Sequence, residues 1–174
     1  MCGIVGVIYK KNFSAEHIRL NLDQALDEIR YRGPDGKGIY INKNIALGHV
    51  RLSIIDLTSN GNQPMLSNND EYVITYNGEV YNFESLKKNL ELDGINFKSK
   101  TDTEVILELF KAQGVSSFKN LNGMFAFSIV DQEKNKAYLV RDRFGVKPLY
   151  YFIDTDQIIF SSEIKAINTI CGQQ

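Results

Sequence analysis

The sequence predicts an α+β fold built from two stacked antiparallel sheets that are flanked by helices. Polar turns of hairpin length, at 42–44, 131–136 and 154–156, separate short β-rich runs, which favours antiparallel pairing. Helical patterns occur early and in the middle of the chain, whereas strand patterns cluster late, so the regular alternation of a parallel βαβ fold is missing. The runs at 124–127 and 158–160 are apolar at consecutive positions, which indicates sheets covered on both faces.

Three segments carry apolar residues at the helical spacing, and each has one apolar face. The first begins with Ser14, a residue type that favours the N-cap position, and ends before the helix-breaking pair Gly33-Pro34. The other two segments end at glycines. They extend from Asn82 to Gly94 and from about Asp102 to Gly114.

Strands are expected where short runs of β-branched and aromatic residues lie between polar turns. The first run, 4–9, contains Gly6 and follows Gly3, two glycines that allow another backbone or a ligand to approach closely. Cys2 would then lie at the open end of this strand. The remaining candidates are 38–41, 45–49, 52–55, 72–76, 124–130, 137–141, 149–153 and 158–161.

The composition is that of one globular domain, 1–174, with 43% hydrophobic and 24% charged residues. The net charge is −1, with 20 basic and 21 acidic residues spread evenly, so neither nucleic acid nor an anionic membrane is an expected partner. No apolar stretch reaches the roughly 20 residues of a membrane span. Cys2 and Cys171 lack metal-ligand spacing and leave a disulfide open, but without an export signal they fit a reducing cytoplasm.

Cys2 follows the initiator Met1, so removal of one methionine would leave a cysteine with a free α-amine at the start of the chain. A thiol has a reference pKa of about 8.5 and an α-amine one of about 7.7 to 8, so near neutral pH the amine can accept the thiol proton. Cys2 is therefore a candidate nucleophile that carries its own base. The alternative is a small buried hydrophobic residue, because free cysteines are among the most buried residue types.

Asn77 and Gly78 follow the apolar run 72–76. Asn-Gly is the strongest short-range signal for a type I′ hairpin turn, which is the structural interpretation. The residues after Glu79, however, run into a helical pattern instead of a second alternating strand. A strand-end loop that offers an Asn amide and a Gly backbone N–H would form an oxyanion hole for acyl transfer. Both interpretations stay open on the local sequence.

Three charged residues indicate a site for a free amino acid. Arg51 lies beside an apolar run, where it makes either a surface salt bridge or a bidentate contact with a substrate carboxylate. Asp102 is a candidate helix cap or first-turn carboxylate. With Glu79 it would instead bind a substrate ammonium. A carboxylate site combined with an ammonium site would recognise an α-amino acid.

Nine motifs follow one another along the chain. They are CGIVGV at 2–7, RYRGPDGKG at 30–38, LGHVRLSIID at 47–56, QP at 63–64, YNGEVYN at 76–82, TDTE at 101–104, LNGMFAF at 121–127, RDRFGVKPLYY at 141–151 and SSEIKAI at 161–167. With these motifs the chain resembles class II glutamine amidotransferase domains, which are N-terminal nucleophile hydrolases, and specifically those of the asparagine synthetase type. The resemblance covers essentially every residue, and RGPD at 32–35 looks like the asparagine synthetase branch.

The resemblance implies a four-layer αββα sandwich that hydrolyses L-glutamine to glutamate and ammonia through a thioester. It implies neither a metal nor an organic cofactor for this domain. The site roles that it implies are a Cys2 nucleophile with its own amine as base, an oxyanion hole from Asn77 and Gly78, an α-carboxylate site at Arg51 and an α-ammonium site at Glu79 and Asp102.

The remaining motif residues are expected to be structural. Arg32, Pro34 and Asp35 would fix a loop, and the segment 141–147 would form part of the contact with a partner domain. His49 would be a packed histidine, because the α-amine of Cys2 already supplies the base.

The resemblance also implies a partner. Asparagine synthetases of this type continue into an ATP-dependent synthetase domain with an SGGxDS-type loop, a motif that this chain lacks. ATP and Mg are therefore expected only in a separate domain or subunit that receives the ammonia. Its acceptor is aspartate, a sugar acid or another carboxylate, and a homodimer is a possible assembly. The alternatives are a non-catalytic domain that binds glutamine or packs on its partner, and a hydrolase of another small amide.

Overall fold

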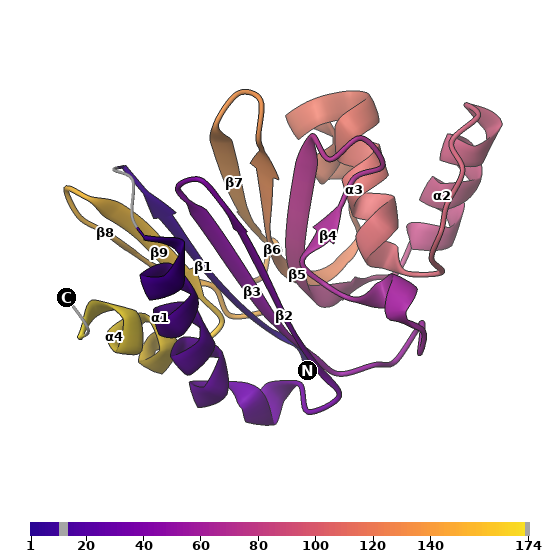
Figure 1. Ribbon diagram of the computed structural model, residues 1–174. Helices are drawn as coiled ribbons and strands as arrows, with labels where there is room; N and C mark the ends of the chain where they lie inside the picture. The colour runs from indigo at the N-terminus through magenta and orange to yellow at the C-terminus, as the bar shows by residue number, and fades with distance from the viewer. Residues whose placement is uncertain (11–13, 173–174) are drawn as a thin grey trace.

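A computed structural model describes residues 1–10 and 14–172 of the chain (Figure 1). Its strands form two sheets, one with the order β2-β3-β1-β9-β8 and the other with the order β4-β5-β6-β7. All neighbouring strands pair antiparallel, as the hairpin-length turns predict. Residues 173–174, which belong to the predicted domain 1–174, lie outside the described residues.

The elements alternate little between helix and strand. The five-stranded sheet consists of β1 (Gly3–Tyr9), β2 (Gly36–Asn42), β3 (Ile45–Arg51), β8 (Tyr150–Ile153) and β9 (Gln157–Ser161). The four-stranded sheet consists of β4 (Met65–Leu66), β5 (Tyr72–Val80), β6 (Gly123–Asp131) and β7 (Lys136–Arg141). The helices are α1 (Ala15–Glu28), α2 (Phe83–Leu92), α3 (Asp102–Gln113) and α4 (Ile164–Cys171), and three 3-10 turns lie at Arg30–Arg32, Ser59–Gly61 and Gly114–Asn120.

The elements stack in four layers, because each sheet buries both of its faces (Figure 1). Along β1, Val5 and Val7 pack against α1 and α4, whereas the alternate residue Ile4 packs against Val73 and Val130 of the other sheet. Helix α3 packs on the outer face of the four-stranded sheet, and α2 packs beside α3. The predicted α+β class and the αββα order of layers are therefore confirmed.

Gly6 of β1 leaves room for the ring of Phe160, its partner on the neighbouring strand β9. A Cβ at this position would lie 2.1 Å from Cζ of Phe160, whose ring is fully buried between the sheets. The close approach predicted for this glycine is thus made by a side chain of β9.

Two predicted elements need correction. Residues 52–55 form a loop and not a strand, because β3 has lost both neighbours by that point: its last partners are Gly3 of β1 and Gly36 of β2. The first helix ends at Glu28, and its predicted last turn is the separate 3-10 turn Arg30–Arg32.

Two elements carry no strong local signal and are absent from the prediction. Helix α4 has eight residues, too short for a clear helical period, and its apolar residues Ala166, Ile167 and Ile170 are buried against α1. Strand β4 has only two residues and exists because it pairs with β5.

Candidate functional site

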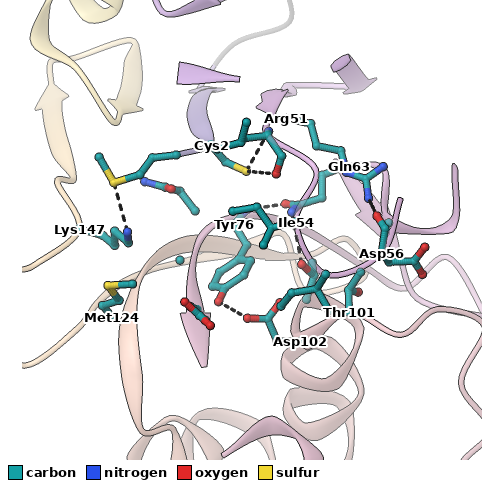
Figure 2. A pocket seen from close by; sticks show the side chains of 18 residues that line it. Cys2, Arg51, Ile54, Asp56, Gln63, Tyr76, Thr101, Asp102, Met124 and Lys147 are labelled. Carbon is teal, nitrogen blue, oxygen red and sulfur yellow. Dashed lines mark hydrogen bonds between the residues drawn. The ribbon is translucent and has the colours of Figure 1, made fainter. Parts of the chain in front are cut away.

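A cavity of about 220 Å³ opens where the ends of β1, β3 and β5 meet the start of α3 (Figure 2). Its wall includes all six of the predicted site residues, although they come from positions far apart in the sequence. These residues are Cys2, Arg51, Asn77, Gly78, Glu79 and Asp102.

Cys2 precedes β1 and is half-buried at the open end of the five-stranded sheet. The Leu52 N–H donates to its Sγ at 3.4 Å, and Nε of Arg32 donates to its carbonyl oxygen at 3.0 Å. Burial raises the pKa of the Cys2 thiol, while the Leu52 hydrogen bond and the positive N-terminus oppose that rise. The thiol is therefore held in place but needs a nearby base to become a nucleophile at neutral pH.

Asn77 and Gly78 lie inside β5, so both the hairpin turn and the strand-end loop are wrong. Strand β5 continues because β6 pairs with it throughout, with Asn77 opposite Ala126 and Gly78 opposite Phe125. The local Asn-Gly signal cannot register a partner strand that lies about 48 residues further along the chain.

The N–H of Gly78 points into the cavity, which follows from the period of the strand. Tyr81 N–H donates to Asn122 O, so the odd-numbered residues of β5 bond toward β6. Tyr76 N–H donates instead to Oε1 of Gln63 at 2.6 Å, and Val80 N–H to Oδ2 of Asp102 at 3.0 Å. Gly78 lies between these two even-numbered residues, so its N–H faces away from β6.

The side chain of Asn77 points from β5 toward the facing sheet and is 1% exposed. Among the described residues its Nδ2 has no hydrogen-bond partner. A buried donor without an acceptor costs about 1 to 3 kcal/mol. The Nδ2 of Asn77 and the N–H of Gly78 are therefore two donors available to a ligand oxygen in the same cavity.

Arg51 ends β3, and its guanidinium organises the loop on one side of the cavity. Nη1 donates to Thr58 O and to Oδ1 of Asn62, both at 2.9 Å, and Nη2 donates to Asp56 O. Arg51 is thus partly buried and forms hydrogen bonds with the loop, in place of the surface salt bridge that was one interpretation of its position. These bonds leave Nε–H and one of the two Nη2 hydrogens without an acceptor among the described residues, so the guanidinium still has donors for a ligand carboxylate.

Asp102 is the first residue of α3, but the cap is Thr101, whose side chain accepts from Glu104 N. Oδ2 of Asp102 accepts from the Tyr76 hydroxyl at 2.5 Å as well as from Val80 N. Burial raises the pKa of Asp102, and those hydrogen bonds oppose the rise. Glu79, by contrast, is exposed at the cavity rim. A ligand ammonium at this wall would stabilise the Asp102 carboxylate.

Comparison with known proteins agrees with this geometry. The model of the glutamine amidotransferase domain family matches residues 1–174. The chain belongs to this family. The resemblance carried by the sequence motifs is thus confirmed, and with it the prediction of an amidotransferase enzyme domain.

Curated relatives of this glutamine amidotransferase domain are longer proteins. A protein of Methanocaldococcus jannaschii, provisionally named glutamine-hydrolysing asparagine synthetase 2, is 43% identical and covers 96% of this chain. Asparagine synthetase B of Escherichia coli is 38% identical over 98% of the chain, and the amidase chry2 of Gibberella zeae is 36% identical over 95%. The chain spans 35%, 30% and 26% of the length of these three relatives.

Solved structures support the fold of the amidotransferase domain. The glutamine phosphoribosylpyrophosphate amidotransferase of Bacillus subtilis superposes with a TM-score of 0.80 at 24% identity. That likeness covers 98% of this chain and 44% of the solved chain.

Three further cavity residues carry little local signal. Gln63 stands in the Gln63-Pro64 motif, and its Nε2 donates to Oγ1 of Thr103 at 3.3 Å while its Oε1 holds Tyr76 N. Tyr76 and Lys147 complete the set. Tyr76 contacts Asp102, 26 positions away in the sequence, and Lys147 contacts Met1, 146 positions away, so no local sequence pattern indicates either contact.

His49 is packed, as predicted for this glutamine amidotransferase domain. It is 0% exposed, and one ring nitrogen, Nε2, contacts Tyr76 O at 3.2 Å. Burial lowers the pKa of His49 to about 3. The ring is therefore neutral near neutral pH.

Arg32 and Asp35 hold loops beside the amidotransferase cavity. Arg32 bonds Cys2 O and pairs with Glu163 at 2.5 Å, while Oδ2 of Asp35 accepts from Ser53 N at 2.8 Å. Pro34 forms an isolated bridge with Arg51.

The described residues hold no group of three or more His, Cys, Asp or Glu side chains placed to bind a metal ion. Across residues 1–10 and 14–172, no helix has the length and apolar character needed to cross a membrane.

Proposed function

We propose that this domain hydrolyses L-glutamine to glutamate and ammonia through a thioester on Cys2. One observation carries the proposal: the Nδ2 of Asn77, which has no hydrogen-bond partner among the described residues, and the N–H of Gly78, which faces away from β6, belong to the wall of the cavity that holds the Cys2 thiol. An oxyanion hole needs donors that are fixed before the reaction begins. Membership of the glutamine amidotransferase domain family supports glutamine as the substrate.

The charged residues of the cavity fit the two ends of an amino acid. The Nε–H and the second Nη2–H of Arg51, which have no acceptor among the described residues, would bind the α-carboxylate. Asp102 and Glu79 would bind the α-ammonium. The side-chain amide of glutamine would then extend toward Cys2.

The Cys2 amine first accepts a proton from the thiol and then donates it to the departing nitrogen of the substrate. Removal of Met1 frees the Cys2 amine, which takes the thiol proton as sulfur attacks the amide carbon. Asn77 and Gly78 stabilise the oxyanion of the tetrahedral intermediate. As this intermediate collapses, the C–N bond breaks and the α-ammonium of Cys2 protonates the departing nitrogen. Ammonia departs, and a γ-glutamyl thioester remains on Cys2. Water, deprotonated by the same amine, then releases glutamate and restores the thiol.

The ammonia would pass to an ATP-dependent synthetase domain or subunit, with ATP and Mg bound there and not in this single domain, 1–174. Relatives named as asparagine synthetases favour aspartate as the acceptor. The alternative acceptor is another carboxylate, such as a sugar acid. The segment 141–147 would form part of the contact, since Phe144 is 92% exposed there. A cytoplasmic location and a homodimer remain predictions.

Glutamate release by the full protein that contains this chain, measured beside its intact mass, tests the proposal. We expect the mass to lack Met1 and glutamate to form at a rate that Cys2→Ala abolishes. Cys171→Ala is the matched control and should retain turnover, because Cys171 lies outside the cavity. Glutamate release that survives in folded Cys2→Ala protein would overturn the assignment. A mature protein that binds glutamine without hydrolysing it, even with ATP and acceptor present, would favour a binding domain.

A further inference from the structure

Lys147 is a buried cation in the wall of the Cys2 cavity (Figure 2). Its side chain and backbone together are 6% exposed. Among the described residues no carboxylate forms an ion pair with it, and its Nζ donates to Sδ of Met1 at 3.2 Å. A thioether is a weak acceptor, so a full charge has been buried here with little compensation.

The loop before Lys147 is built to hold this residue in place. Lys147 N–H donates to Oδ2 of Asp142 at 3.0 Å, and its carbonyl oxygen accepts from Nε of Arg141 at 2.7 Å. The other oxygen of Asp142 accepts from the N–H groups of Phe144 and Val146. The ammonium therefore extends into the cavity from a backbone fixed on both sides.

The contact with Met1 places this ammonium near the future chain start. The Met1 Sδ is three bonds from its Cα, and the Cys2 nitrogen is two bonds from that Cα, so Nζ lies within about 10 Å of the Cys2 nitrogen. Removal of Met1 would take away the sulfur and leave the ammonium facing the Cys2 amine.

We propose that Lys147 is an electrostatic positioning residue for the proposed glutaminase and holds the Cys2 α-amine in its free-base form once Met1 is gone. This inference rests on the proposed function. A fixed positive charge repels a second one, so the amine releases its proton more readily and can accept one from the thiol. Over such a distance the effect amounts to about half a unit to one unit of pH.

The other charged groups around the cavity do not cancel this effect. Asp56 is a carboxylate that accepts hydrogen bonds from Thr58 and from the Lys100 N–H, and its charge is the same in wild type and in a Lys147 variant. Glu79 and Asp102 are the same in wild type and in a Lys147 variant, so they do not enter the difference between the two, and the Tyr76 hydroxyl, which bonds Asp102, stays neutral because burial raises its pKa. Among the described residues, Arg51 and Arg32 are also cations near Cys2, and both are unchanged in a Lys147 variant.

The test is the pH dependence of kcat/KM for glutamine hydrolysis by the full, mature protein. In Lys147→Met the acid limb should move to higher pH by about half a unit to one unit, with kcat/KM recovering at high pH. Lys147→Arg should keep the limb near its original position. The control Lys88→Met removes an exposed charge on α2, away from the cavity, and should shift nothing.

A second readout does not depend on turnover. In a Cys171→Ser background, alkylation of Cys2 by iodoacetamide should show the same upward shift in Lys147→Met, because the thiol and amine titrate as a pair. If neither the pH profile of kcat/KM nor that of alkylation shifts in Lys147→Met, the inference is overturned. A higher KM with an unshifted acid limb would also overturn it, because Lys147 would then be a substrate ligand. Absence of Cys2-dependent glutamate release from wild type would instead refute the proposed function, and the alkylation profile would still decide the role of Lys147.

Discussion

At the scale of single residues, the cavity wall combines groups whose hydrogen bonds are complete with donors that are still open. Gln63 and Tyr76 are fixed by each other and by α3, through Thr103 and Asp102. Asn77 follows Tyr76 directly and is as deeply buried, yet its Nδ2 has no partner among the described residues. An unpaired buried donor costs stability, so its presence is explained best by an oxygen that arrives with the substrate.

Asn77→Ala should therefore lower kcat for glutamine hydrolysis by about 10²- to 10³-fold, because one of the two oxyanion donors is lost. KM should change little, since Arg51, Glu79 and Asp102 would still bind the substrate. Steady-state kinetics on the full protein would check this, with Asn120→Ala, an exposed asparagine outside the cavity, as control. A rise in KM with unchanged kcat would contradict the oxyanion role.

Sequence reasoning at this scale finds residue types better than it finds their surroundings. All six predicted site residues line the cavity. They could be predicted because the chemical role of each is indicated by its residue type. Tyr76 and Lys147 escape such reasoning because a tyrosine in an apolar strand and a lysine in a loop have ordinary structural explanations. Their significance arises only from contacts with Asp102 and Met1, which folding creates.

At the scale of secondary structure, the predictions succeed where an element is long and periodic. They fail where pairing with another strand decides whether a segment forms a strand. The patterns locate α1, α2 and α3 and most strands. Residues 52–55 have strand-forming side chains but no strand beside them, while Asn77 and Gly78 look like a turn but are paired with β6. Tertiary pairing thus overrides local preference in both places.

The close packing of β1 on β9 makes a prediction for Gly6. Gly6→Ala would place a Cβ 2.1 Å from the ring of Phe160, which is enclosed between the sheets and cannot move away freely. Overpacking of this kind costs typically about 1 to 3 kcal/mol of the free energy of unfolding. Urea denaturation would measure it, with Gly94→Ala unsuitable as a control because Gly94 has a positive φ of 87°. Gly36→Ala is suitable, since its nearest neighbour lies 3.4 Å away, and equal stabilities of the two variants would contradict the packing argument.

At the scale of the whole molecule, the two sheets enclose His49 as a neutral ring, and this makes stability depend on pH. The folded pKa is about 3 against an ordinary value near 6.5, so the unfolded chain binds an extra proton between these values. The free energy of unfolding should be greatest above pH 6.5 and should fall by up to about 1.4 kcal/mol per pH unit as the solution is acidified below it. Asp102, whose pKa is raised by burial, opposes this trend at lower pH.

Comparison with His49→Gln isolates the contribution of His49, because glutamine can also donate to Tyr76 O but does not titrate. Denaturation curves between pH 7 and 5 should show a shallower loss of stability in this variant, while Asp102 contributes equally to both proteins. Identical slopes for the two proteins would mean that His49 is not held neutral.

Trapping of the acyl-enzyme would show whether Cys2 is an N-terminal nucleophile. The full protein would be quenched with acid during glutamine turnover, and its N-terminal peptide analysed by mass spectrometry. We expect a peptide that begins at Cys2 and carries a γ-glutamyl group on sulfur, which hydroxylamine removes. A peptide that keeps Met1, or a mature one that stays unmodified while the acyl group is found on another residue, would contradict it.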